Sequence, residues 1–196
     1  LQSKDIIFKW TTDYCTGISG IDKQHYRLIE LINELCFKTM NNELEGSNED
    51  EEYAVKVFKE LQNYTKYHFS EEYTEMINGK LCKEAIESHC AEHSTFVNQL
   101  SILEYAFLRN AKEEIWKLLY FLSHWLSTHI LISDKSLTRQ ILAIREGIDP
   151  KEVWAREKYA MNIFSNRANL DSIMKLIEKI SLLKRNQNYG QHIPAR

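Results

Sequence analysis

The chain has 196 residues, of which 43% are apolar, and its formal net charge is -3. This length and apolar fraction suit one globular domain with an extension, or two small domains, and exclude a disordered chain. Basic and acidic residues are interspersed, so nothing in the composition indicates a surface for nucleic acid or anionic lipid. Two prolines and six glycines are too few for a many-stranded fold and favour long helices. We therefore predict an all-α protein.

The four cysteines show no C-x-x-C spacing, which predicts reduced thiols in a cytoplasmic protein. Cys90 is expected to pack rather than to bind a metal, because it lies about 100° round the helix from His89. The longest uncharged run, Leu118 to Ser133, is shorter than a bilayer span and predicts a buried helix, so no membrane segment is expected. The sequence starts at Leu1 without a methionine, which suggests a processed form or a fragment of a longer protein.

The first predicted helix follows an irregular arm over residues 1–18, in which Trp10 is the apolar anchor. Ser19 is the expected N-cap, and the helix behind it carries His25 on its apolar face. A lone histidine on an apolar face is more often a hydrogen-bonded core residue than a ligand. The acidic stretch from Asn41 to Asp50 is expected to be a loop.

The second predicted helix places His68 and Glu72, four residues apart, on its apolar stripe, and is expected to stop at Asn78-Gly79. Ionised carboxylates avoid protein cores unless they are paired or bind a cation, so Glu72 is the most informative residue of this helix. The neighbouring Glu71 is expected to face solvent.

The third helix, from about Lys83 to Leu108, turns His89 and His93 inward. A fourth helix follows a turn at Arg109-Asn110 and carries His129 on its apolar side. Asp134 stands five residues after His129, about 140° away on an ideal helix. Both can reach one site only by side-chain reach or by local loosening of the helix. His124 lies off the same line and is expected at the rim or behind the ligands.

Seven inward-facing polar residues are thus spread over four helices. They are His25, His68, Glu72, His89, His93, His129 and Asp134. No single metal needs seven such ligands, whereas two octahedral ions that share the two carboxylates would use all of them and leave a position for an outside ligand. Imidazole and carboxylate suit iron, and thiolate is absent, which argues against an iron–sulfur or structural zinc site. The sequence therefore predicts a dinuclear iron centre.

The chain resembles the hemerythrin family, specifically its bacterial branch, over roughly residues 8–137. The motifs that carry the resemblance are Trp10, T-G-I and I-D-K-Q-H over 16–25, H-F-x-x-E with Met76, H-x-x-x-H, and W-L-x-x-H-I-x-x-x-D over 125–134. The resemblance implies an up-down-up-down four-helix bundle and an oxo- or hydroxo-bridged pair of non-haem irons that binds O2 reversibly at the two-histidine iron. Tyr73 stands where relatives often carry a second glutamate, and it is expected off the metal face.

The resemblance also implies how the ligands are divided between the two irons. His89, His93 and His129 would bind one iron, and His25 and His68 the other. Glu72 and Asp134 would bridge the pair.

Three other interpretations compete with this one. H-C-A-E-H also fits the H-x-x-E-H pattern of inverzincin proteases, but Glu92 is expected to turn away from the two-histidine face and the remaining ligands would have no role. A di-iron oxidase, peroxidase or ferroxidase usually relies on four glutamates, whereas five neutral imidazoles favour ferrous iron and binding over turnover. A metal-free bundle would leave buried polar groups unpaired at about 1–3 kcal/mol each.

The last 59 residues, 138–196, are expected to form a helical extension of the metal-binding domain over 1–137. Gly147 should end one helix, and Asp149-Pro150 should start another that runs to about Arg185. Its heptad positions are Ile163, Asn166, Leu170, Ile173, Ile177 and Ile180. This helix either packs back on the bundle or forms a homodimer. The resemblance to bacterial hemerythrins implies that such a dimer would link an O2 or redox sensor to an output domain absent here, such as a diguanylate cyclase. A simple O2 carrier or storage protein is the alternative function, and His192 in the tail is not expected to be a ligand.

Overall fold

The computed structural model describes residues 9–40, 48–109, 111–162 and 182. All its regular elements are helical: η1 (Thr12–Tyr14), α1 (Ser19–Met40), α2 (Asn48–Asn78), α3 (Lys83–Phe107), α4 (Ala111–Thr128), the π-helical η2 (His129–Asp134) and α5 (Lys135–Arg145). A further helical stretch covers residues 150–162. The predicted all-α class is confirmed.

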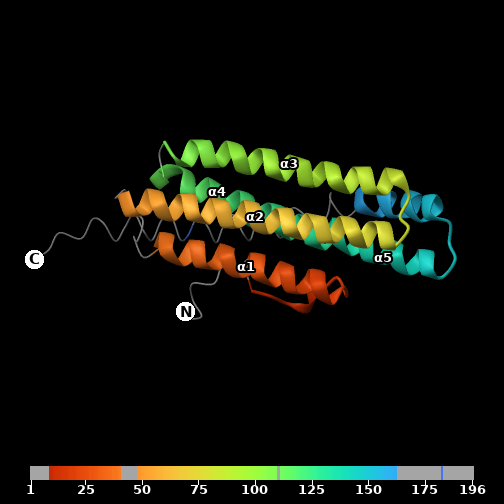
Figure 1. The fold of residues 1–196 in the computed structure, drawn as a ribbon. Helices are drawn as coiled ribbons and strands as arrows, with labels where there is room; N and C mark the ends of the chain where they lie inside the picture. The colour runs from red at the N-terminus through yellow and green to blue at the C-terminus, as the bar shows by residue number, and fades with distance from the viewer. Residues whose placement is uncertain (1–8, 41–47, 110, 163–181, 183–196) are drawn as a thin grey trace, which may run out of the picture.

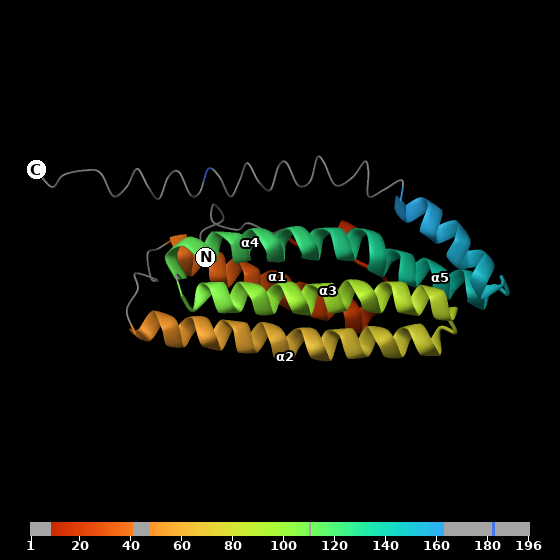
Figure 2. The same cartoon turned by 90° about the horizontal axis from the view of Figure 1, so that it is seen from above.

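The four long helices form a ring in which α1 packs on α2 and α4, and α3 packs on the same two helices. Successive helices run in opposite directions (Figures 1 and 2), as predicted. Leucines, isoleucines and phenylalanines from all four fill the core between them, including Leu28, Phe58, Leu100 and Leu119. Among the described residues, no helix is long and apolar enough to cross a membrane.

The start of α1 differs from the prediction. Ser19 is the first helical residue rather than the cap. The carboxylate of Asp22 instead accepts hydrogen bonds from the backbone N–H groups of Thr16 and Gly17, at 2.7 and 3.2 Å, and from the Thr16 hydroxyl at 2.7 Å. A carboxylate in the first turn interacts favourably with the positive end of the helix dipole. Asp22 can therefore hold the N-terminal arm against the start of α1 without a serine cap.

In the turn after α2, the neighbouring residues Gly79 and Lys80 have different roles. The helix stops at Asn78, as predicted, but Lys80 adopts the left-handed conformation, with φ 58°. Bonds from the Leu81 N–H to the Met76 carbonyl (3.1 Å) and from the Lys80 N–H to the Ile77 carbonyl close a Schellman turn. The start of α2 at Asn48 also shortens the predicted acidic loop.

Gly79 is needed for packing rather than for its backbone angle. A Cβ at this position would lie 2.5 Å from Cγ1 of Ile141. The absence of a side chain therefore lets α5 lie directly against the end of α2.

The chain after η2 continues without a break into α5, and then folds back (Figure 2). Gly147, with φ 92°, ends the helix as predicted. The Asp149 carboxylate caps the next helix by accepting hydrogen bonds from the backbone of Lys151 and Glu152, at 2.9 and 3.2 Å.

The helical stretch 150–162 lies against the bundle. Val153 is buried, and Trp154 packs on an apolar cluster that includes Met76, Leu137 and Ile141. The extension was expected either to pack on the bundle or to dimerise. Its first part packs on the bundle. The predicted heptad, Ile163 to Ile180, and the tail with His192 lie outside the described residues, and the domain boundary at residue 137 stays a prediction.

Candidate metal centre

The fold brings all seven predicted residues to one point inside the bundle. His25 comes from α1, His68 and Glu72 from α2, His89 and His93 from α3, and His129 and Asp134 from η2. All are buried, and none exposes more than 7% of its surface. Their nitrogen and oxygen atoms form two clusters suited to metal ions, one of Glu72, His89, His93 and His129, the other of His25, His68, Glu72 and Asp134.

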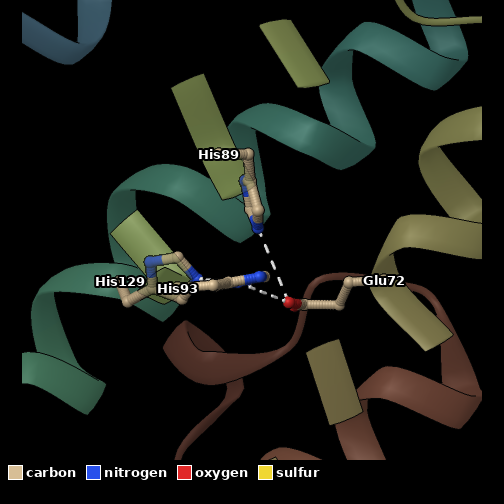
Figure 3. Close-up of side chains that lie close together, drawn as sticks. All are labelled: Glu72, His89, His93 and His129. Atoms are coloured by element: carbon tan, nitrogen blue, oxygen red, sulfur yellow. Dashed lines mark hydrogen bonds and ion pairs between the residues drawn. The ribbon is translucent and has the colours of Figure 1, made fainter. Parts of the chain in front are cut away.

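The three-histidine cluster is shown in Figure 3. Oε2 of Glu72 lies 3.0 Å from Nε2 of His93 and 3.5 Å from Nε2 of His89. Nε2 of His93 and Nε2 of His129 face each other at 2.9 Å. Four potential ligand atoms thus surround one small volume, which is the arrangement that a metal ion requires.

The two-histidine cluster lies on the other side of the same carboxylates. Nε2 of His25 lies 3.1 Å from Oδ2 of Asp134. Oε1 of Glu72 lies 3.4 Å from Nε2 of His68 and 3.8 Å from Nε2 of His25.

Each carboxylate divides its two oxygens between the clusters. Glu72 points Oε2 at the three-histidine group and Oε1 at the two-histidine group. Asp134 does the same, because its Oδ1 lies 3.1 Å from Nε2 of His129 while its Oδ2 faces His25. Two carboxylates placed between two sets of imidazoles have the geometry of bridges in a dinuclear site.

The nitrogen and oxygen atoms of the two clusters are suited to bind cations. Within the described residues, both oxygens of Glu72 and of Asp134 and Nε2 of His25, His68 and His89 are buried without a hydrogen-bond partner. Leaving one such group unsatisfied costs about 1–3 kcal/mol, and more when it is charged. Metal ions placed in the two clusters would give each of these seven atoms a partner.

Local loosening of the fourth helix solves the spacing problem of Asp134. Residues His129–Asp134 form a π-helical segment, in which the i to i+5 repeat brings positions five apart to the same face. His129 and Asp134 therefore both point into the centre. The sequence had left side-chain reach as the other option.

Two residues behind the ligands were missed by the sequence analysis. Oε1 of Gln24 lies 2.8 Å from Nδ1 of His68, and Oε2 of Glu92 lies 2.9 Å from Nδ1 of His129. Ser133 also donates to Oε2 of Glu92, at 2.6 Å. An acceptor at Nδ1 fixes the ring orientation and keeps the Nε2 lone pair available for a metal.

The expectation for Glu92 was therefore wrong in one respect. Its carboxylate turns toward His129 on a neighbouring element rather than away from the site. Burial opposes its charge, but His129 and Ser133 hold the pKa of this carboxyl below its usual range. Histidine ligands usually donate their second N–H to such a group, but no spacing within α3 indicated that the partner of Glu92 would be His129, 37 positions away.

The pKa values of the buried groups in the centre are shifted in opposite directions. Burial opposes ionisation of Glu72 and Asp134, yet the facing imidazoles hold the pKa of both carboxyls well below the usual range. Burial also opposes the charge of His25 and His129, but the carboxylates outweigh it and raise the pKa of His25 to about 9 and that of His129 to about 10. For His68 burial prevails and lowers the pKa to about 4. The iron-free cluster therefore holds protons that a metal ion would displace.

Aromatic rings wall the three-histidine side. Phe69 stacks on His93 with ring centroids 3.7 Å apart, and Trp125 stacks on His129 at 4.2 Å. Phe96 packs on Trp125 at 4.3 Å. These rings hold the imidazoles in place and keep water from that flank.

Tyr73 and Glu71 face solvent, as expected. Tyr73 is 48% exposed, and Glu71 is exposed as well. His124 makes a ring contact with Tyr120, 5.8 Å between centroids, so its position gives no support to a role behind the ligands. Cys90 is a free, half-buried thiol that packs on the apolar cluster beneath Trp154, as expected.

Comparison with known proteins gives a consistent result. The sequence profile described as the hemerythrin HHE cation binding domain matches residues 16–141. Bacteriohemerythrin of Clostridium acetobutylicum is 26% identical over 130 residues, which are 66% of this chain and 97% of that protein. Bacteriohemerythrin of Pseudomonas aeruginosa is 33% identical over 128 residues, 64% of this chain and 75% of that protein.

A third relative, the bacteriohemerythrin of Stenotrophomonas maltophilia, is 31% identical over 137 residues, 68% of this chain and 81% of that protein. No solved structure shows a significant match. The profile match runs from just before α1 into α5 and contains all seven residues of the buried cluster. The chain therefore belongs to the hemerythrin family, whose domain holds a non-haem di-iron centre that binds O2.

Proposed function

We propose that the seven buried donors ligate two irons in the arrangement that the family resemblance implied. His89, His93 and His129 hold one iron, His25 and His68 hold the other, and Glu72 and Asp134 bridge them. The observation that carries this proposal is the division of each carboxylate's oxygens between the two histidine groups.

When bound and reduced, the irons supply reversible O2 binding. The chain supplies the environment for that chemistry. Five imidazoles and only two carboxylates give a ligand set of low negative charge, which favours the ferrous state over the high-valent states that oxidising enzymes need. Gln24 and Glu92 fix two of the rings, and Phe69 and Trp125 keep one flank dry. We infer a binding module rather than an enzyme.

We further propose that this module is an oxygen or redox sensor rather than a carrier. The support is mechanical: η2 carries two of the proposed ligands and continues directly into α5, on which the helix 150–162 packs. A change in the π-helical turn would rotate or shift α5, because π and α turns differ in residues per turn. A homodimer through the predicted heptad, with an output domain downstream, would receive that motion.

The experiment follows the absorption spectrum of the iron-loaded chain. The anaerobic ferrous protein is exposed to O2, returned to an inert atmosphere and exposed again. A reversible spectrum over several cycles is expected. Conversion to the ferric form on the first exposure, without an oxygenated intermediate, would instead indicate an oxidase or ferroxidase and contradict the proposal.

The sensor role has a separate test. Hydrogen exchange of backbone amides in α5 and in residues 150–162 is compared between the deoxy and oxygenated states. Slower or faster exchange in these segments is expected, while α2 between Asn48 and Leu61 serves as the internal control. Equal exchange throughout α5 would favour a carrier.

A further inference from the structure

A small cavity, partly open to solvent and bordered by the exposed Ser88, lies between the three-histidine cluster and the C-terminal extension. Its walls include Ser88, His89 and Glu92 of α3, Ser136 and Gln140 of α5, and Trp154 of the helix 150–162. The floor is thus formed by one of the metal-binding histidines and by the carboxylate that holds another. The roof belongs to the part of the chain beyond the family match, which ends at residue 141.

Gln140 has an unsatisfied amide in this cavity. The side chain is 4% exposed, and its amide nitrogen donates to Oγ of Ser136 at 3.2 Å. Its Oε1 is buried without a hydrogen-bond partner among the described residues. A buried amide oxygen in this condition is costly unless a further donor is present.

The cavity has the size and the polarity for one such donor. The centre of a water molecule can occupy ≈ 10 Å³ of it, about the space that one ordered water needs. Serine hydroxyls and the Gln140 amide on its walls offer the two to four polar partners that a buried water requires.

The roof of the cavity is fixed in place. Arg139 and Glu157 form a two-pronged ion pair, with Nε 3.0 Å from both carboxylate oxygens and Nη2 2.7 Å from Oε2. The Glu157 side chain is 15% exposed and the Arg139 side chain 45% exposed, so water screens this pair in part, and its contribution comes mainly from the two-pronged geometry. Val153 is 3% exposed. The helix 150–162 is therefore clamped on α5, with Trp154 turned toward the bundle.

We propose that Gln140 binds a buried water molecule under Trp154, and that the helix 150–162 closes this side of the di-iron centre to solvent. The water joins the extension to the backs of His89 and Glu92, so the extension contacts the centre through a polar site as well as through the α5 backbone. The inference rests on the proposed metal centre, and it adds a binding site that lies partly outside the family match.

The water site is tested by crystallography of the iron-loaded full chain. A peak within about 3.2 Å of the Gln140 amide oxygen is expected, and it should vanish in Gln140→Leu, whose apolar side chain occupies nearly the same volume. A dry cavity around an ordered Gln140 in the unmodified chain would overturn the assignment.

The closing role is tested by the rate at which the anaerobic ferrous protein loses iron to an excess of a ferrous chelator. Trp154→Ala should lose iron about tenfold faster, because it removes the roof of the cavity and lowers the cost of local opening. Tyr159→Ala, on the same helix but 70% exposed, is the matched control and should stay within about twofold of the unmodified chain. Equal rates for Trp154→Ala and Tyr159→Ala would overturn the closing role.

A second variant covers the case in which Trp154→Ala does not fold. Arg139→Gln cuts only the clamp to Glu157 and should speed iron loss about threefold; an unchanged rate would count against the proposal. Neither readout uses O2. A chain that cycles reversibly with O2 but loses iron at the same rate in all variants would refute the closing role and leave the proposed function intact, whereas a chain that does not retain two irons would refute the proposed function.

Discussion

Glu72→Gln is the most informative single substitution, because it keeps the size of the side chain and removes one charge. Glu72 is 0% exposed, and its two oxygens lie 3.0 to 3.8 Å from Nε2 of four imidazoles. Removing one partner from a buried charged cluster costs about 3–5 kcal/mol. At about 1.4 kcal/mol per factor of ten, we expect iron affinity to fall by about two to four orders of magnitude.

The assay is an anaerobic ferrous titration with the bound iron counted per chain. The matched control is Glu71→Gln, the adjacent residue of the same helix, which is exposed and should bind iron like the unmodified chain. Circular dichroism checks that both variants keep their helices. If Glu72→Gln holds two irons as tightly as Glu71→Gln, the assignment of Glu72 as the shared ligand is refuted.

Two further predictions concern core contacts and pH. Gly79→Ala should destabilise the chain by about 1–3 kcal/mol in urea unfolding, because the new Cβ would lie 2.5 Å from Ile141; Gly20→Ala, with nothing within 4 Å, should be neutral or stabilising. Burial lowers the pKa of His25 and His129, but the carboxylates raise it to about 9 and about 10, so the folded iron-free chain binds more protons than the unfolded chain above pH 6.5. Its unfolding free energy should therefore fall as the pH rises from 6.5 to 9, by about 1.4 kcal/mol per unit for each extra proton, and a flat profile of the iron-free chain would contradict the raised pKa values.

The inward direction of four proposed ligands followed from the sequence because helical spacing alone orients them. His68 and Glu72, like His89 and His93, stand four residues apart and must share a face. The five-residue step from His129 to Asp134 carried less information, because an α-helix and a π-helical turn place Asp134 on different faces. Only the structure distinguishes the α-helical from the π-helical conformation, and it shows a π-helical turn.

Residues that act across helices were harder to predict. Glu92 is one residue away from His93, and the period of its own helix turned it off the metal face. Its actual partner, His129, lies 37 positions away. Gln24 likewise bonds His68 across α1 and α2. Such contacts depend on the crossing and register of two helices, which no local pattern encodes.

Turn chemistry showed a similar limit. Asn78-Gly79 marked the correct end of α2, but the left-handed residue is Lys80, and Gly79 is required by the close approach of α5. At Gly147 the glycine does take the left-handed position, so the same residue type serves two different purposes in one chain.

The central claim is that seven residues from four helices hold two irons between them. Anomalous diffraction at the iron absorption edge, on crystals of the reconstituted chain, tests it most directly. Two peaks are predicted, one bounded by His89, His93 and His129 and the other by His25 and His68, with Glu72 and Asp134 between them. A single peak, or iron located away from these side chains, would contradict the account.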